Sequence, residues 1–334
     1  MDSADPPFHE TYKALFNNAA KESTPPMAIS TFEECELPLI DLSRLDKSPD
    51  ESMECKAEIA KASREWGFFQ VVNHGISREI LERMRREQVK VFKQPFQEKV
   101  KEELLLNMSS GSYRWGSPRA TCLRQLAWSE AFHVPLTDIL GSDGFSNLSS
   151  TMEQFAATLS GLANRLAEIL AENMGHSWSD YMRENCLLRS CYLRINRYPP
   201  CPMFPTNVFG LVPHTDSDFL TVLHQDDVGG LQLVRDGRWF AVNPKPDVLI
   251  VNIGDLFQAW SNGVYKSVVH RVATNPRVER FSTAYFLCPS DDTVIKSCGE
   301  PPVYRDFSFR EYLQQVKEDV KNLGDKVGLP RFLL

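Results

Sequence analysis

The feature that most constrains this chain is a series of short apolar segments between residues 187 and 290, separated by turn residues. Segments rich in β-branched and aromatic residues, bounded in this way, are typical of β-strands. No helical pattern lies between them, so successive strands predict an antiparallel sandwich or barrel rather than a doubly wound parallel sheet. The turn signals are Pro199-Pro200, Gly229-Gly230, Asp236-Gly237 and Asn262-Gly263.

Helical patterns flank this stretch. Residues 150–174 place apolar side chains at three- and four-residue steps, which predicts a long amphipathic helix whose role is packing. Its expected start is a capping box formed by Ser150 and Glu153, and its expected end is Gly175. The remaining elements are predicted at residues 37–42 (strand), 51–65 (helix), 67–72 (strand) and from the cap Ser308 to Gly324 (helix).

Composition limits the class of protein. The chain has 334 residues, 42% hydrophobic and 24% charged, which is the balance of an ordinary globular protein. Its net charge is −7 and no long run of like charge occurs, so we expect no nucleic-acid partner. No apolar run approaches the ~18 residues that a membrane helix needs, so we expect no membrane partner either.

Cysteine usage and the first residues suggest a compartment. The eight cysteines are scattered without a paired CxxC spacing, as expected for reduced thiols. The first 43 residues hold acidic residues but no arginine, and no apolar run follows Met1, which argues against a transit or signal peptide. We therefore expect a soluble, cytoplasmic protein.

His214-Thr215-Asp216 places an imidazole and a carboxylate two residues apart. On a strand both side chains point to one face, with α-carbons roughly 6.5 Å apart, so both can reach one ion. His270 lies in a second strand-like run, residues 265–273, and can complete the set. Two histidines and a carboxylate leave coordination positions open, which non-haem iron(II) oxygenases use for co-substrate and dioxygen.

The same three residues can also occur without an iron site. Short His-x-Asp matches arise by chance, so an exposed His214 and a satisfied core His270 would give the same spacing. Two imidazoles and a carboxylate also serve catalytic zinc, which leaves a zinc hydrolase as an alternative.

A second constellation begins ten residues after His270. In the strand-like run of residues 280–286, Arg280 and Ser282 share one face. An arginine inside a barrel needs an anion, because an unpaired buried charge is costly. Its planar fork matches a carboxylate, to which Ser282 can also donate. This pairing predicts a carboxylate-bearing co-substrate beside the metal.

A third strand-like run, residues 188–198, alternates between polar and apolar faces, and the polar face suits a wetted cavity. Tyr198 could supply a hydroxyl to the carboxylate that Arg280 holds. Arg194 could face an acidic substrate or form a surface salt bridge. The polar face carries Tyr192, Arg194, Asn196 and Tyr198.

From Leu37 onward the chain resembles the plant 2-oxoglutarate-dependent dioxygenases. The shared motifs are Trp66-Gly67-Phe68-Phe69, Asn73-His74-Gly75, Asn196-Arg197-Tyr198-Pro199-Pro200-Cys201, His214-Thr215-Asp216, His270-Arg271-Val272 and Arg280-Phe281-Ser282. Within that family the chain is most similar to gibberellin 2-oxidases of the class acting on 20-carbon gibberellins. That likeness rests on Ser112-Tyr113-Arg114-Trp115-Gly116, Trp128-Ser129-Glu130-Ala131-Phe132-His133 and Val327-Gly328-Leu329-Pro330-Arg331-Phe332-Leu333.

The resemblance implies a mainly β fold, a double-stranded β-helix (jelly roll) with flanking helices. It implies an irregular lead-in at residues 1–36, an N-terminal α/β region at 37–180, the jelly-roll domain with the iron and 2-oxoglutarate sites at 181–295, and a C-terminal helical segment at 296–334. It further implies that dioxygen is consumed and that ascorbate is the reductant. A structural role is expected for His74. By the same resemblance, iron(II) is held by His214, Asp216 and His270, and 2-oxoglutarate by Arg280, Ser282 and Tyr198, Arg280 being also catalytic.

For the substrate, the resemblance implies a diterpenoid acid that is hydroxylated at the 2β position and thereby inactivated. Such an acid needs an apolar pocket with one cation for its carboxylate. Two alternatives stay open: a dioxygenase of the same fold acting on another plant metabolite, such as a flavonoid or another gibberellin intermediate, and a non-catalytic hormone-binding barrel. The candidate substrate residues are Tyr113, Arg114, Arg194 and Phe286.

Overall fold

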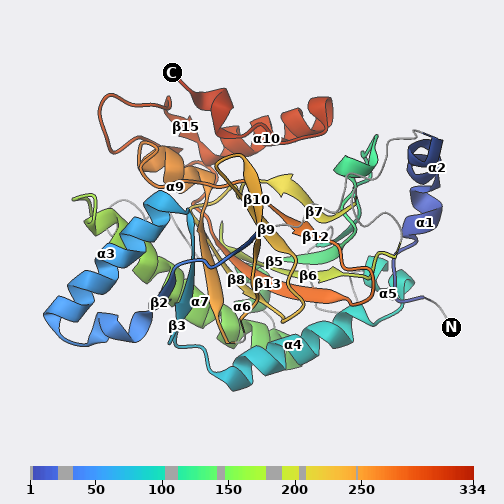
Figure 1. Cartoon of the computed structure of the whole chain (residues 1–334), viewed down its shortest axis with the longest axis horizontal. Coiled ribbons are helices and arrows are strands. Elements are labelled where there is room, and N and C mark those ends of the chain that lie inside the picture. The colour runs from blue at the N-terminus through green and yellow to red at the C-terminus, as the bar shows by residue number, and fades with distance from the viewer. Residues whose placement is uncertain are drawn as a thin grey trace.

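Two β-sheets form the centre of the computed structural model of this protein (Figure 1). The structure describes residues 3–21, 33–101, 112–140, 147–177, 190–202, 208–245 and 247–334. Apolar side chains from both sheets pack together, including Phe68 and Ile250 from one sheet and Leu231 and Leu233 from the other. The two facing sheets, whose central pairings are antiparallel, give the jelly-roll core that the sequence predicts.

The larger sheet lines one side of the cavity that is described below. Its pairings are antiparallel except where the edge strand β2 runs parallel to β3. In sheet order its strands are β2 (Leu39–Asp41), β3 (Phe68–Val72), β11 (Leu249–Ile253), β8 (Leu220–Gln225), β13 (Arg280–Leu287), β6 (Tyr192–Tyr198), β5 (Glu130–Pro135) and β4 (Tyr113–Trp115).

The smaller sheet lies opposite. Its β9–β10 hairpin turns at Asp236-Gly237, where both residues have positive φ, as a two-residue hairpin turn requires, and this predicted turn is confirmed. The predicted turn at Asn262-Gly263 instead follows a short helix. In sheet order the strands are β1 (Glu33–Cys35), β10 (Arg238–Val242), β9 (Leu231–Arg235), β12 (His270–Ala273) and β7 (Phe209–His214).

Helices cover the outer face of the larger sheet. The side chains that alternate away from the cavity, such as Leu193 on β6 and Tyr285 on β13, pack into one apolar core with α3, α4 and α7. Ser48 and Ser77 cap the first two of these helices by accepting hydrogen bonds from Glu51 N and Ile80 N. The helices are α3 (Pro49–Glu65), α4 (Arg78–Phe92), α5 (Phe96–Lys101), α6 (Leu136–Leu140) and α7 (Asn147–Glu172), with the 3₁₀ turns η1 (Leu42–Asp46) and η2 (Leu123–Gln125).

Several predicted boundaries shift. The long helix is confirmed, but it begins at Asn147, so Ser150 lies inside it and the predicted capping box is wrong. Residues 265–273 were predicted as one strand, yet only His270–Ala273 forms β12. Tyr265 instead buries its side chain and donates its hydroxyl to Leu170 O at 2.8 Å, on α7. Burial against a helix therefore outweighed the strand propensity of this segment.

The N-terminal residues are more ordered than predicted. The expectation of an irregular lead-in is wrong over α1 (Phe8–Thr11), α2 (Lys13–Lys21) and β1. Phe8, Tyr12 and Phe16 are buried against a cluster that includes Trp128, and Phe8 stacks on the Trp128 ring at 4.4 Å. Aromatic burial of this size orders a short segment whose local sequence is weakly helical.

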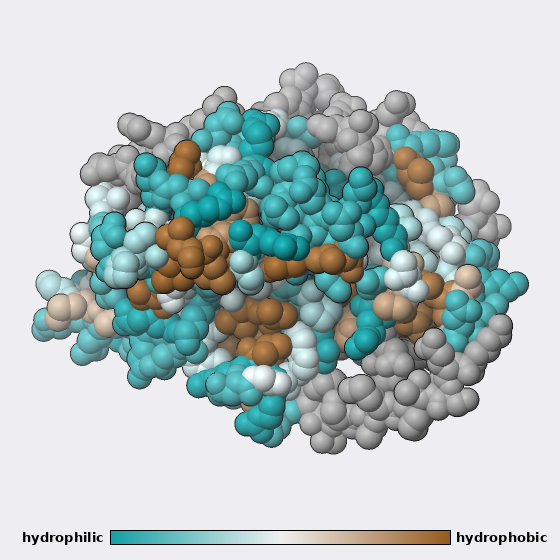
Figure 2. All heavy atoms as spheres, turned by 90° about the horizontal axis from the view of Figure 1, so that it is seen from above, coloured by the Kyte–Doolittle hydropathy of each residue, from teal (hydrophilic) through white to brown (hydrophobic). Residues whose placement is uncertain are grey.

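The C-terminal residues form a helix, α10 (Phe309–Leu323), that lines part of the cavity. Ser308 caps this helix as predicted, since its Oγ accepts from Glu311 N, but the Glu311 carboxylate pairs with Arg305 instead of completing a capping box. Gly324 ends the helix with φ of 81°. Figure 2 shows the face that carries α10, where hydrophobic residues gather in patches among hydrophilic ones. In the part of the chain that the structure describes, no helix is long and apolar enough to cross a membrane. The remaining elements are α9 (Asp255–Trp260), β14 (Val294–Ile295), β15 (Phe307–Ser308), α10 (Phe309–Leu323) and η4 (Leu329–Phe332).

Candidate active site

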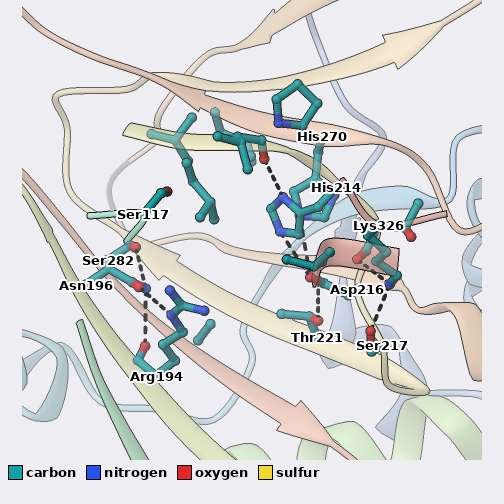
Figure 3. Close-up of a pocket in the computed structure, with 18 of the residues that line it drawn as sticks. Ser117, Arg194, Asn196, His214, Asp216, Ser217, Thr221, His270, Ser282 and Lys326 are labelled. Atoms are coloured by element: carbon teal, nitrogen blue, oxygen red, sulfur yellow. Dashed lines mark hydrogen bonds and ion pairs between the residues drawn. The ribbon is translucent and has the colours of Figure 1, made fainter. Parts of the chain in front are cut away.

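Three candidate metal ligands meet where β7 and β12 pair. His214 ends β7 and is the register partner of His270, the first residue of β12, while Asp216 lies in the loop just after β7. Asp216 Oδ1 is 3.5 Å from His214 Nε2 and 3.7 Å from His270 Nε2. One ligand atom from each of the three lies within 4.8 Å of the others (Figure 3). Register between two strands thus brings together residues that are 56 positions apart in the sequence.

The two imidazoles are oriented by backbone carbonyls. His214 Nδ1 is 2.8 Å from Val212 O, and His270 Nδ1 is 3.0 Å from Val268 O. A proton on each Nδ1 satisfies these contacts and leaves the Nε2 lone pairs facing Asp216. Burial and the neighbouring His214 lower the pKa of His270 to about 4. His270 is therefore neutral at neutral pH, as a metal ligand must be.

The two oxygens of the Asp216 carboxylate have different partners. Its Oδ2 accepts hydrogen bonds from Thr221 Oγ1 at 2.6 Å and Asn252 Nδ2 at 2.8 Å, which leaves Oδ1 toward the imidazoles. Burial alone would raise the pKa of Asp216, but the two histidines and Thr221 hold it well below its usual range. A carboxylate oxygen with two imidazole nitrogens is a donor set that suits iron(II) and leaves positions open.

Arg280 supplies the second half of the site. Its side chain lines the cavity, the residue is 2% exposed, and Nη2 donates to Gln225 Oε1 at 2.7 Å. Its other two buried nitrogens, Nε and Nη1, have no hydrogen-bond partner. A buried guanidinium with free donors is costly unless an anion accepts from it. The arginine therefore fits a carboxylate ligand, as the sequence predicts.

Ser282 and Tyr198 lie beside Arg280. Ser282 Oγ accepts from Asn196 Nδ2 at 3.3 Å across the β6–β13 pairing, and Ser282 lines the cavity. Tyr198 is the register partner of Arg280, and the centre of its ring lies 4.9 Å from the guanidinium carbon. Tyr198 thus supports the arginine with its ring, and its predicted hydroxyl contact to the co-substrate stays a prediction.

The cavity itself lies between the two sheets and has a volume of about 550 Å³, within the usual range for small-molecule sites. Arg194 and Phe286, two of the predicted substrate residues, line it. Phe286 stacks on Tyr192 at 4.5 Å, which makes a flat apolar surface. Arg194 Nε donates to Asn196 Oδ1 at 3.0 Å, on the side of the cavity opposite the metal ligands (Figure 3).

The other two predicted substrate residues, Tyr113 and Arg114, are not among the residues that line the described cavity. Tyr113 is buried away from the cavity and donates its hydroxyl to Glu130 Oε2 at 2.5 Å. Glu130 also pairs with Lys99 and Arg197 in a buried charge cluster. Arg114 follows Tyr113 on the strand β4, so it points the other way, and it is exposed outside the described cavity. Arg114 pairs in register with Ala131, and Ala131 pairs with Asn196, so Arg114 lies on the same sheet face as the cavity-lining residues of β6.

Sequence reasoning missed several residues of this site. Thr221, Asn252 and Gln225 are polar residues on strands β8 and β11 whose side chains alternate into the cavity or against its ligands. A polar residue inside an otherwise apolar strand was the signal that could have revealed Asn252. Lys326 and the cavity wall at residues 117–120 carried no such signal, because they lie in irregular segments.

His74, for which a structural role was expected, lies outside the described cavity. Its Nε2 is 3.2 Å from Asp247 O and its Nδ1 accepts from Ile76 N. The ring thus joins two loops, and the expected structural role is confirmed.

Two facing sheets, three convergent metal ligands and an unsatisfied arginine together define a non-haem iron(II) oxygenase that takes a carboxylate co-substrate. Comparison with known families agrees. The 2OG-Fe(II) oxygenase superfamily model matches residues 184–289, and the model described as the N-terminal region of a non-haem dioxygenase in morphine synthesis matches residues 37–142.

Relatives that match over the full length of the chain identify its family within this superfamily. The chain is 61% identical to gibberellin 2-beta-dioxygenase 8 of Arabidopsis thaliana, over 98% of both chains. It is 50% identical to gibberellin 2-beta-dioxygenase 6 of Oryza sativa subsp. japonica, over 98% of this chain and 96% of that protein. The chain therefore belongs to the 2OG-Fe(II) oxygenase superfamily and, within it, to the family of these gibberellin 2-beta-dioxygenases.

Solved structures support the fold. JOX2, solved with 2OG, Fe and JA, is 30% identical and superposes with a TM-score of 0.69 over 89% of this chain and 91% of that one. The dioxygenase for auxin oxidation in rice is 28% identical, with a TM-score of 0.72 over 90% of this chain and all of that one. Together with the family model, these likenesses confirm the jelly-roll oxygenase fold.

Proposed function

We propose that this protein hydroxylates gibberellins at the 2β position, with 2-oxoglutarate as co-substrate, and that it acts on 20-carbon gibberellins. The observation that carries the reaction type is Arg280, whose two unpartnered donors open into the cavity that also holds the metal ligands. The substrate class is supported by the full-length likeness to gibberellin 2-beta-dioxygenases.

Each part of the cavity has a distinct task in this reaction. Iron and 2-oxoglutarate, when bound, supply the oxidising power to insert oxygen into a C–H bond. His214, Asp216 and His270 would hold the iron in an orientation fixed by their own hydrogen bonds. Arg280 and Ser282 would hold one carboxylate of 2-oxoglutarate, which aligns the rest of that molecule with the metal.

A diterpenoid acid fits the rest of the cavity by its chemistry. The stacked rings of Phe286 and Tyr192 and the side chains of Leu211 and Val316 offer apolar surface for a fused-ring skeleton. Arg194 is a cation on the side of the cavity away from the metal ligands. It would donate hydrogen bonds to the acid group and so turn the opposite end of the substrate toward the iron.

The test is a substrate panel. Purified protein would be incubated with iron(II), ascorbate and 2-oxoglutarate and with a 20-carbon gibberellin, a 19-carbon gibberellin or a flavonoid, followed by mass spectrometry of the products. We expect a 2β-hydroxylated product from the 20-carbon gibberellin, with one succinate released per product. Turnover of the flavonoid alone would overturn the proposed substrate.

Asp216→Ala is the matched catalytic control. It removes one of three metal ligands, so we expect product formation to fall by more than about 100-fold, beyond the roughly 10- to 100-fold effect of losing an outer-shell contact. Full turnover by this variant would exclude the iron mechanism. Oxygen consumption during the same assay separates an oxygenase from a zinc hydrolase, and product formation separates it from a hormone-binding barrel.

The reductant and the cellular location of the protein can each be tested. We propose ascorbate as the reductant, which predicts that omitting it shortens the period of linear product formation. We also propose a cytoplasmic location, supported by eight cysteines that are scattered without a paired CxxC spacing, as expected for reduced thiols. Imaging a fluorescent fusion in plant cells tests that location.

A further inference from the structure

The loop that carries Asp216, residues 215–218, is not held by a strand ladder and is here called the metal loop. It follows the end of β7, and the first turn of α9 fixes part of its backbone. Asp255 N donates to Asp216 O at 2.9 Å, and Leu256 N donates to Asp218 O at 3.0 Å. The position of this ligand therefore depends on contacts from outside the β7–β12 pair.

Lys326, just beyond the end of α10, supplies further contacts to this loop. Its Nζ lies 2.8 Å from Thr215 O, 2.8 Å from Ser217 Oγ and 2.8 Å from Asp255 Oδ2. The side chain is only 10% exposed. Figure 3 shows the ammonium group beside Ser217 and close to Asp216. The lysine thus contacts the metal loop on both sides of the ligand.

Asp255 is the centre of the same cluster. Its side chain is 4% exposed, and its Oδ2 also accepts from Thr215 Oγ1 at 2.9 Å and from the hydroxyl of Tyr312 on α10. A buried carboxylate with one cation and two hydroxyl donors is well satisfied, and removing the cation leaves a charge without its partner. The C-terminal helix and the metal loop therefore share one buried ion pair.

The contacts of Lys326 argue against a role in binding the substrate acid, although it lines the cavity. An ammonium group has three N–H donors, and the three oxygen contacts account for all of them. Arg280, by contrast, keeps two donors unpartnered. Lys326 and Arg280 therefore serve different purposes in the described cavity.

We propose that Lys326, with Asp255 and Tyr312, is a positioning group that holds the metal loop and so sets the affinity of the site for its metal. The C-terminal segment becomes part of the iron site without supplying a ligand. This proposal rests on the metal site and is independent of which substrate the enzyme takes.

The test is metal affinity measured apart from turnover. Lys326→Met keeps the length and apolar stem of the side chain and removes its three donors. The affinity of the full chain for Mn(II) is measured from the EPR signal of free Mn(II). We expect this affinity to fall by about 10- to 100-fold in Lys326→Met, as for other contacts that orient metal ligands. The matched control is Lys321→Met, the same substitution at an exposed position in the last turn of α10, which should bind Mn(II) like the parent.

Two results would overturn the proposal. Parent-like Mn(II) affinity in Lys326→Met would show that the lysine does not position the site. A rise in KM for the gibberellin with unchanged Mn(II) affinity would assign Lys326 to substrate binding instead. Failure of the proposed gibberellin activity would leave the Mn(II) measurement intact, so the two proposals fail separately.

A milder variant covers the case in which Lys326→Met does not fold. Tyr312→Phe removes only the hydroxyl that donates to Asp255 and keeps the buried ring. We expect a several-fold loss of Mn(II) affinity at a thermal midpoint close to that of the parent. In a double-mutant cycle, Lys326→Met combined with Asp255→Asn should lose less affinity than the two single losses added together, because both act through one ion pair. Additive losses, or a Tyr312→Phe variant with parent-like affinity, would count against the proposal.

Discussion

The two ends of the cavity are built in different ways. At the metal end, His214 and His270 face each other across β7 and β12, and Arg280 faces Tyr198 across β13 and β6, so strand register positions the chemistry. At the substrate end, Arg194 and the stacked rings of Tyr192 and Phe286 come from the larger sheet, but part of the wall comes from residues 117–120 and from the last part of α10, which lie outside both sheets. Ladder hydrogen bonds hold the strands of His214, His270 and Arg280, whereas isolated contacts hold the metal loop and residues 117–120.

Those isolated contacts can be named. The backbone N–H of Ser117 donates to the Tyr12 hydroxyl at 2.7 Å, which ties the wall to the N-terminal helices. A Cβ on Gly324 would approach the Gln125 side chain to 2.1 Å, so the end of α10 packs directly on η2. The sheets therefore fix both histidines and Arg280, whereas part of the substrate wall lies on segments that can change without disturbing the sheets.

The largest effect is expected at the metal end, from Arg280→Met. Truncating a buried charged partner costs about 2–5 kcal/mol, so KM for 2-oxoglutarate should rise by at least about 30-fold, while KM for the gibberellin changes little. Steady-state kinetics with each substrate varied in turn give both constants. Arg280→Lys keeps the charge without the planar fork, so its KM for 2-oxoglutarate should lie between those of the parent and the Arg280→Met variant. Equal changes in both KM values would mean that the two ends are not separable.

A smaller effect is expected at the substrate end, from Arg194→Ala. Loss of one hydrogen bond to a charged group costs about 1.5–3 kcal/mol, so KM for the gibberellin acid should rise by roughly tenfold or more, with KM for 2-oxoglutarate unchanged. Arg86→Ala is the matched control, because this arginine is exposed on α4 and does not line the described cavity. A parent-like KM in Arg194→Ala would remove this arginine as the recognition group.

The smallest effect is expected from Tyr12→Phe, which removes the acceptor of the Ser117 N–H and keeps the aromatic packing. A single hydrogen bond contributes about 1 kcal/mol, so KM for the gibberellin should rise by less than about fivefold. The iron and 2-oxoglutarate affinities should stay as in the parent. A change in either affinity would show that the N-terminal helices reach the metal end after all.

Sequence reasoning worked best where a periodic pattern meets a chemical constraint. The alternation in residues 188–198 and 280–286 placed Arg194, Ser282 and Phe286 on the cavity face because a strand turns every second side chain to the same side. His214 and Asp216 were predicted on one strand, and they do converge, although Asp216 lies just past the end of β7.

Sequence reasoning was least successful where contacts between distant residues determine the position of a side chain. Tyr113 was a candidate for the pocket on a family motif, but the buried Glu130 accepts its hydroxyl. The helices near Phe8 and Tyr12 form because distant tryptophans bury those rings. The role of Lys326 depends on oxygens more than 70 and more than 100 residues earlier in the chain. Local pattern carries no information about such partners.

Because Arg280 has two unpartnered donors, binding of 2-oxoglutarate would also raise the free energy of unfolding of the protein. A ligand that binds only the native state stabilises it in proportion to the logarithm of its concentration, by about 2.7 kcal/mol at 100 times Kd. The guanidinium is a desolvated charge that 2-oxoglutarate would neutralise. The amount of folded protein in a cell would then rise and fall with the supply of its co-substrate, a link between central carbon metabolism and the lifetime of the enzyme itself.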